Sequence, residues 1–340
     1  MYSKILSKED KKELNSKNYL LNLKSNCVLK KILANIGKNK SFKIIKCNKK
    51  IQKRLNINVK DYKEYSERYT PIEIEIIPIK NEYSPFINIE GDKSYYHIYF
   101  NDNEKEIKKY SLKKDDNISK IKIKIDYEVK SFEKLFCQCK CIESINFKKF
   151  YRNNITQMRS MFLGCSSLKK LLNFNSFNTD NATNMSDMFY GCSSLKELNL
   201  NNFNTTNVFN MKFMFSGCSS LKELNLNNFN TINTTRMADM FHGCSSLQTL
   251  NLNNFNTNNV TNMADMFWGC SSLKELNLNN FNTNNVTDMG YMFEGCSSLK
   301  ELNFKNFSAG GVTNMKSMFS GCSNELIMKI KILIILILLV

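Results

Sequence analysis

Cysteine is the residue type with the greatest potential for chemistry in this sequence, which holds 12 of them among 340 residues. Seven follow a glycine and lie 26 or 27 residues apart: Cys165, Cys192, Cys218, Cys244, Cys270, Cys296 and Cys322. A zinc site needs converging ligands, commonly in closely spaced pairs, and these cysteines occur singly. Disulfide frameworks are typical of short secreted chains. We therefore predict that the seven cysteines are reduced and act as small buried core residues.

Three further cysteines, Cys137, Cys139 and Cys141, form one dense cluster. Their alternate spacing would place the side chains on one side of an extended segment, where they could hold a soft metal. No partner ligands are identifiable in the sequence. We therefore expect the cluster to pack in the core, and we expect no metal and no cofactor.

The other reactive residue types form no catalytic arrangement. His97 and His242 each lack a nucleophile or an acid at the spacing of a known motif, and no HExxH, GxSxG or phosphate-binding glycine loop occurs. Methionine pairs such as Met263 and Met266 recur at helical spacing, as core residues do. We predict that the protein is not an enzyme.

The cysteine spacing belongs to an internal repeat. The stretch GCSSLKELNLNNFNT, residues 269–283, occurs in six closely similar copies, and the degenerate stretch Leu135–Phe150 aligns with it. Alternation at its leucines predicts a short strand, and Val260–Phe267 has the apolar spacing of two helical turns. Gly269 follows where a helix would end. One strand and one short helix in 26 residues predict one coil of a solenoid, which must stack on its neighbours to bury its apolar side.

The repeated sequence NMxxMFxGCSSLKELNL, present with small changes from Met185 to Leu302, resembles the BspA-like leucine-rich repeat family. The resemblance covers residues 131–324. It implies an α/β solenoid of about seven units and, in some bacteria and protists, adhesion at the cell surface, and it carries no catalytic residues. We find no signal peptide, which favours a cytoplasmic location and leaves the cell surface as the alternative.

The rest of the chain divides into a basic α+β region, residues 1–130, and an apolar tail, residues 325–340. Residues 1–150 carry 34 Lys and Arg against 20 Asp and Glu. Residues 26–57 predict two short helices, loosely similar to the helix pair of an F-box adaptor. Residues 72–80, 95–100 and 118–126 predict strands, and we expect this region to cover the open end of the first coil.

The apolar tail breaks the repeat after Ser323. Residues 330–340 are rich in β-branched side chains, which favours a strand. The uncharged apolar run, Ile332–Val340, is well short of the about 20 residues that a membrane-spanning helix needs. Membrane contact through 330–340 is therefore not favoured. We expect that a chain lacking residues 326–340 stays folded and becomes more soluble.

Two columns of repeat residues are candidates for binding. Residues between the leucines face the concave side of a leucine-rich repeat, which gives the column Asn199, Asn225, Asn251 and Asn277. The position before the glycine varies freely and holds Tyr190, His242, Trp268 and Glu294. Interfaces depend on a few distinctive aromatic or arginine anchors, so the variable column is a candidate recognition stripe.

These observations predict a non-enzymatic scaffold for protein–protein interaction. The alternatives are a surface adhesin of BspA type and an F-box-like substrate adaptor. We expect a monomer whose partner is a protein, which the sequence does not identify. The lysines of the basic region are scattered, so we do not expect nucleic acid as the partner.

Overall fold

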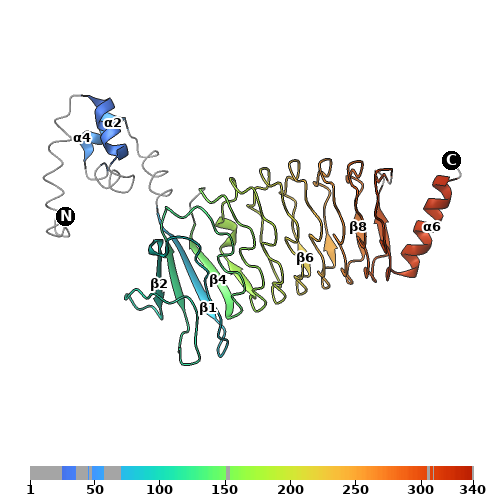
Figure 1. The fold of residues 1–340 in the computed structure, drawn as a ribbon, viewed down its shortest axis with the longest axis horizontal. Helices are drawn as coiled ribbons and strands as arrows, with labels where there is room; N and C mark the ends of the chain where they lie inside the picture. The colour runs from blue at the N-terminus through green and yellow to red at the C-terminus, as the bar shows by residue number, and fades with distance from the viewer. Residues whose placement is uncertain are drawn as a thin grey trace. The chain divides into compact units, whose positions relative to one another are not determined.

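The computed structural model describes residues 25–35, 45, 48–56, 70–150, 154–304, 307–308 and 310–338. The chain forms two compact parts, Met1–Tyr69 and Thr70–Val340. The second part holds the strands and the repeat units of the described residues (Figure 1). It begins at residue 70, ahead of the repeat units, and its first strand pairs with the first repeat unit.

The first part contains the two expected helices, α2 (Asn26–Asn35) and α4 (Lys49–Leu55). The side chain of Asn48 caps α4 by accepting hydrogen bonds from the backbone N–H groups of Lys50 and Ile51. Leu29 of α2 and Ile51 of α4 are fully buried. The prediction of a helix pair between residues 26 and 57 is confirmed.

The second part begins with a five-stranded sheet in the order β2-β3-β1-β4-β5. Its strands are β1 (Ile72–Pro78), β2 (Tyr96–Phe100), β3 (Ile121–Ile125), β4 (Ile142–Lys149) and β5 (Lys170–Leu172), and short 3-10 turns lie at Lys93–Tyr95 and Phe174–Ser176. Alternate side chains of β1, β2 and β3 are buried, and the three predicted strands are confirmed. β4 belongs to the degenerate repeat unit, and it pairs antiparallel with β1 and parallel with β5. The sheet therefore covers the first unit, as expected.

Successive repeat units lie side by side and parallel. Backbone bridges join equivalent residues of neighbouring units in an unbroken series: Ser131, Gln157, Asn184, Asn210, Arg236, Asn262, Asp288 and Asn314. Figure 1 shows the units as successive turns of chain between β4 and α6. Each unit adds the same apolar side chains to one core, and the phenylalanine rings of one column stack at 5.4 to 5.7 Å.

The cysteines form a buried column within this core. Cys192, Cys218, Cys244, Cys270 and Cys296 are free thiols with at most 1% exposure. Each thiol donates a hydrogen bond to a phenylalanine carbonyl of the preceding unit; Cys192 Sγ, for example, lies 3.2 Å from the Phe162 oxygen. Burial raises the pKa of Cys244 to about 12, which keeps this thiol protonated and unreactive. The predicted burial is confirmed for these five cysteines and for Cys165, whereas Cys322 in the last unit is only partly buried.

Threonine side chains form hydrogen bonds with backbone groups of the next unit. Thr205 is fully buried, and its hydroxyl donates to the Asn230 carbonyl at 2.9 Å while accepting from the Asn230 N–H at 2.8 Å. Thr231, Thr257 and Thr283 repeat this arrangement one unit further each time. The polar residues of the repeat are therefore largely structural.

The short helix expected in each unit does not form. Residues 185–191 adopt turns in which backbone N–H groups bond alternately within the unit and to the next one: Met188 N to Met185 O, then Phe189 N to Met214 O. Asp187 and Gly191 have φ of 57° and 69°, and a left-handed residue every fourth position excludes an α-helix. The apolar spacing correctly marked the buried side chains, but bonding between units determines the backbone.

The leucine segments form strands shorter than expected. β6 (Glu223–Leu224) pairs in parallel with β7 (Thr249–Leu250), and β8 (Glu275–Asn277) pairs with β9 (Glu301–Asn303). In the described part of the chain, these are two separate two-stranded sheets and not one continuous sheet. The asparagine that follows each leucine accepts a hydrogen bond from the backbone N–H two residues later, which turns the chain away from the strand direction.

The strand predicted for the apolar tail is wrong, because Asn324–Leu338 is a helix, α6. Leu326 and Ile330, one helical turn apart, are 1% and 7% exposed and belong to the core of the repeat units. Lys329 bonds Glu325 across the same turn at 3.0 Å. Tertiary packing thus overrides the β-propensity of the isoleucines. In the described part of the chain, no helix is long and apolar enough to cross a membrane.

Candidate functional site

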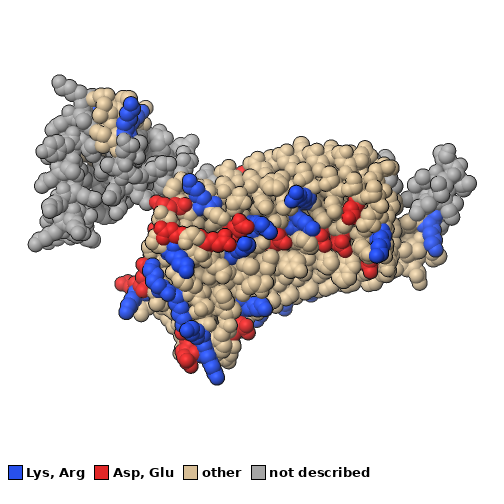
Figure 2. All heavy atoms as spheres, viewed as in Figure 1, with Lys and Arg blue, Asp and Glu red and all other residues tan. Residues whose placement is uncertain are grey.

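The residues between the leucines line an open groove on the repeat units. The groove has a volume of about 620 Å³. Its lining side chains come from successive units: Glu197, Asn199, Glu223, Asn225, Thr249, Asn251, Glu275 and Asn277. The structure therefore brings the predicted asparagine column together on one hollowed surface. On the face drawn in Figure 2, charged side chains gather in a band along the units, and the surface beside the band is mostly uncharged.

The four groove asparagines use much of their bonding capacity within the protein. The side-chain oxygens of Asn199, Asn225, Asn251 and Asn277 each accept a backbone N–H two residues later at 3.0 Å. The amide of Asn225 also donates to Asn201 of the preceding unit. The glutamates beside them are exposed. A partner in the groove would therefore meet exposed carboxylates next to asparagines whose side-chain oxygens are already bonded to the backbone.

The column before the glycine is not uniform in the structure. Tyr190 and Trp268 are 42% and 37% exposed, and Tyr190 packs edge-on against Phe213. The ring of His242 stacks on the indole of Trp268, with centroids 4.4 Å apart and planes 13° apart. One carboxylate oxygen of Glu294 is buried without a hydrogen-bond partner in the described part of the chain. Within this column, His242 and Trp268 of adjacent units thus contact each other directly.

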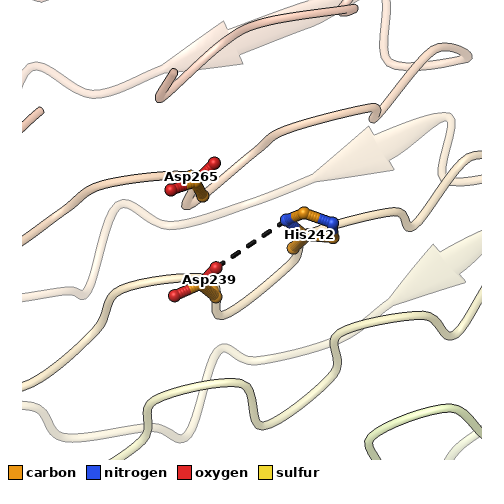
Figure 3. A group of neighbouring side chains, drawn as sticks. All are labelled: Asp239, His242 and Asp265. Atoms are coloured by element: carbon orange, nitrogen blue, oxygen red, sulfur yellow. Dashed lines mark ion pairs between the residues drawn. The ribbon is translucent and has the colours of Figure 1, made fainter. Parts of the chain in front are cut away.

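Two aspartates that sequence reasoning missed lie beside His242. One ligand-type atom from each of Asp239, His242 and Asp265 lies within 4.8 Å of the others, and all three side chains are half-buried. Figure 3 shows the imidazole beside the two carboxylates, which come from adjacent units. The sequence contained the signal: Asp239 precedes His242 by one turn of chain, and the 26-residue register places Asp265 over Asp239. The interpretation of His242 as isolated is therefore wrong.

The electrostatics of this cluster favour its uncharged forms. Burial, assisted by the charge of Asp265, raises the pKa of Asp239 to about 6, although Lys212 opposes the rise. Burial also raises the pKa of Asp265. Burial lowers the pKa of His242, so at neutral pH its imidazole is the neutral form that binds metal ions.

His97 also has acidic neighbours that its sequence context did not indicate. Its two ring nitrogens lie 3.1 Å from Glu106 and 3.1 Å from Asp126. His97 lies on β2, Glu106 lies in the segment between β2 and β3, and Asp126 directly follows β3. Both nitrogens are occupied by carboxylates, which makes His97 a structural bridge.

Comparison with known proteins identifies a family. Residues 130–251 and 219–329 match the family described as "Mycoplasma protein of unknown function, DUF285". Together these segments cover more than half of the chain. The protein belongs to the DUF285 family. The family segment includes the groove and the Asp239–His242–Asp265 cluster, and it begins at the degenerate unit that contains β4. No curated protein and no solved structure gives a significant match.

Proposed function

We propose that this DUF285 protein is a non-enzymatic scaffold for protein–protein interaction, whose stacked units form a solenoid of the leucine-rich repeat type. The observation that carries the proposal is the groove of about 620 Å³, which is lined by the leucine segments of successive units and by the polar residues between and after those leucines. Hollow surfaces built from regular repeats are typical binding surfaces of solenoid proteins. The partner is a protein, and the scaffold acts as a monomer.

The chemistry of the groove supports a polar protein surface as its ligand. Glu197, Glu223 and Glu275 present carboxylates at the same position of different units. Complementary charges at an interface increase the association rate and select among partners. A partner segment with basic side chains at matching intervals would pair with these carboxylates, and its polar groups would meet the asparagine columns.

The test uses the full-length chain with the charge of the groove reversed. Glu223→Lys and Glu275→Lys together should reduce capture of partner proteins from the native cell at least about tenfold, since each juxtaposed like charge opposes binding. Glu104→Lys and Glu128→Lys, two exposed acids outside the groove, make the matched control with the same change in net charge. Equal capture by both double variants would exclude the groove as the binding surface.

A surface adhesin of BspA type is the first alternative function. It rests on the resemblance of the repeat sequence. Labelling intact cells with a membrane-impermeant reagent distinguishes the two, because an adhesin would be labelled and an internal scaffold would not.

An F-box-like adaptor is the second alternative. It rests on the helix pair α2 and α4, whose Leu29 and Ile51 are buried within the first compact part. An adaptor would bind its ubiquitin-ligase subunit through this part even when the groove carries the two charge reversals. Loss of all partners on groove reversal would therefore argue against it.

A further inference from the structure

We propose that Asp239, His242 and Asp265 form a binding site for one divalent transition-metal ion of the zinc type. Each residue offers one ligand atom, and the three atoms lie within 4.8 Å of one another. In the described part of the chain, this is the one group of His, Cys, Asp and Glu side chains with such convergence. The site lies on the turns that hold the variable column, and it is independent of the proposed groove function.

The repeat register positions the two carboxylates. Asp239 and Asp265 occupy the same position of adjacent units, and both have left-handed backbones, with φ of 58° and 57°. The backbone N–H groups of Asp239 and Asp265 donate to carbonyls of the next unit at 2.9 Å. Both carboxylates therefore project from backbone that is fixed by hydrogen bonds between units, as a preorganised site requires.

The imidazole of His242 is held in place but lacks a partner at the relevant atom. Stacking on Trp268 at 4.4 Å fixes the plane of the ring. Nδ1 is buried and makes no hydrogen bond in the described part of the chain. Its distance to Asp239 Oδ1 is 3.7 Å, too long for a hydrogen bond. A buried imidazole nitrogen without a hydrogen bond, close to two carboxylates, is an arrangement that a metal ion would complete.

A cation would also relieve the electrostatic cost of the cluster. Lys212 supplies a positive charge, but its Nζ lies 3.8 Å from Asp239 Oδ2, at the distance of a weak surface ion pair. The Asp239 and Asp265 carboxylates also lie close enough to repel each other, since their oxygens are within 4.8 Å. A divalent ion between them would attract both and would need no proton from His242, which is neutral.

The donor set favours zinc over calcium or magnesium. One imidazole nitrogen and two carboxylate oxygens suit Zn²⁺ and related ions, whereas Ca²⁺ takes about six to eight oxygen ligands. Three protein ligands leave a fourth tetrahedral position for water. Ligand atoms around Zn²⁺ lie roughly 2.0–2.2 Å from the ion, so the side chains would move slightly closer together on binding.

The chain contains one tryptophan, Trp268, which makes the test local. Zn²⁺ is titrated into the full-length reduced protein while Trp268 fluorescence is recorded, and calorimetry measures the stoichiometry. We expect one equivalent to change the fluorescence. Co²⁺ in place of Zn²⁺ should give ligand-field absorption without thiolate charge transfer, because no cysteine belongs to the site.

Variants separate this site from other metal-binding groups. Asp265→Asn and His242→Gln should each weaken Zn²⁺ binding at least about tenfold. Asp187→Asn is the matched control, since Asp187 has the same left-handed backbone position in a unit that holds Tyr190 instead of histidine. It should bind Zn²⁺ like the wild type. Circular dichroism confirms that the variants are folded.

Three results would overturn the proposal. They are a wild-type chain whose Trp268 fluorescence is unchanged by Zn²⁺, equal Zn²⁺ affinity in all four proteins, and a Co²⁺ complex with thiolate charge transfer. The Zn²⁺ and Co²⁺ titrations of the wild-type chain test the site even if a variant does not fold.

Discussion

At the scale of single residues, Asp239 shows how the site affects stability. Its pKa of about 6 lies above the ordinary value of 3.8, so the folded state binds its proton more tightly than the unfolded state. The stabilising contribution is complete below pH 4 and is lost as the pH rises through 6. At pH 7.5 the ionised carboxylate therefore destabilises the fold.

We predict that Asp239→Asn raises the free energy of unfolding at pH 7.5, measured in the presence of a metal chelator. Two pKa units correspond to about 3 kcal/mol, and solvent screening of the half-buried group reduces the expected gain to about 1–2 kcal/mol. Urea denaturation at pH 7.5 and at pH 4 measures the effect. The gain should vanish at pH 4, and a variant less stable than wild type at pH 7.5 would contradict the assignment.

His97 has the same direction of pH dependence as Asp239, but here the substitution is expected to destabilise the fold. Burial lowers its pKa, but hydrogen bonds with Asp126 and Glu106 outweigh burial, so the pKa is raised above 6.5. Protonated His97 therefore stabilises the fold below pH 6.5, and this contribution is lost as the pH rises through the folded-state pKa. Wild type should exceed His97→Gln in thermal stability at pH 5.5 by more than at pH 8.5. A gap independent of pH would exclude the charged bridge.

The residue scale also shows where the sequence is informative. Burial of the cysteine column followed from its single occurrence in each unit. The contacts of His242 did not follow: the 26-residue register places Asp265 over Asp239, but it does not show that the imidazole lies beside both carboxylates. The contacts of His97 with Glu106 and Asp126 depend on strand pairing, which the spacing of these residues does not indicate.

At the scale of elements, the glycine column determines how closely the turns approach. Gly217 has φ of +73°, and a Cβ there would lie 3.3 Å from Cα of Gly191. Gly217→Ala should lower the free energy of unfolding by about 2–5 kcal/mol, because left-handed strain of about 1–2 kcal/mol adds to overpacking of about 1–3 kcal/mol. Chemical denaturation measures the loss.

Gly91→Ala is the control for this substitution. Gly91 has φ of +91°, but a Cβ added there would have no neighbouring atom within 4 Å, so only the backbone strain applies. Its loss should be about 1–2 kcal/mol. Equal losses in the two variants would show that close approach between units contributes nothing.

The elements differ in how well the sequence predicts them. The strands of residues 72–78, 96–100 and 121–125 have isoleucines or aromatics at alternate positions. A two-residue period of apolar side chains is typical of a strand. The turns at residues 185–191 have apolar spacing close to that of a helix. Their left-handed Asp187 cannot be recognised from spacing, since aspartate also occurs in helices. The hydrogen bonds that select turns come from the next unit and are absent from any local pattern.

At the scale of the whole molecule, the repeat units require a cover at each end. The sheet of β1 to β4 covers the first unit, as the sequence analysis expected. At the other end, α6 places Leu326 and Ile330 in the core. An apolar cavity of about 200 Å³ adjoins Ile330 and is lined by Phe293, Phe304, Phe307 and Phe319. Removal of α6 would increase the exposure of these rings to water, so we now expect a chain lacking residues 326–340 to be less soluble, in place of the gain expected from the sequence.

We therefore predict that Leu326→Ser with Ile330→Ser loosens the last unit. Each substitution removes a buried aliphatic side chain, at a cost of about 2–5 kcal/mol. In a stack of units that contact only their neighbours, this loss remains local. Hydrogen exchange should accelerate in residues 299–323 and stay unchanged around Cys192, and sedimentation should detect self-association through the exposed end. Met328→Ser is the control, because Met328 is 63% exposed on the same helix and should alter neither measurement. If exchange in residues 299–323 were equally slow in the double variant, α6 would not stabilise the end of the repeat, and the aromatic side chains beneath it would have to be protected by another segment of the chain.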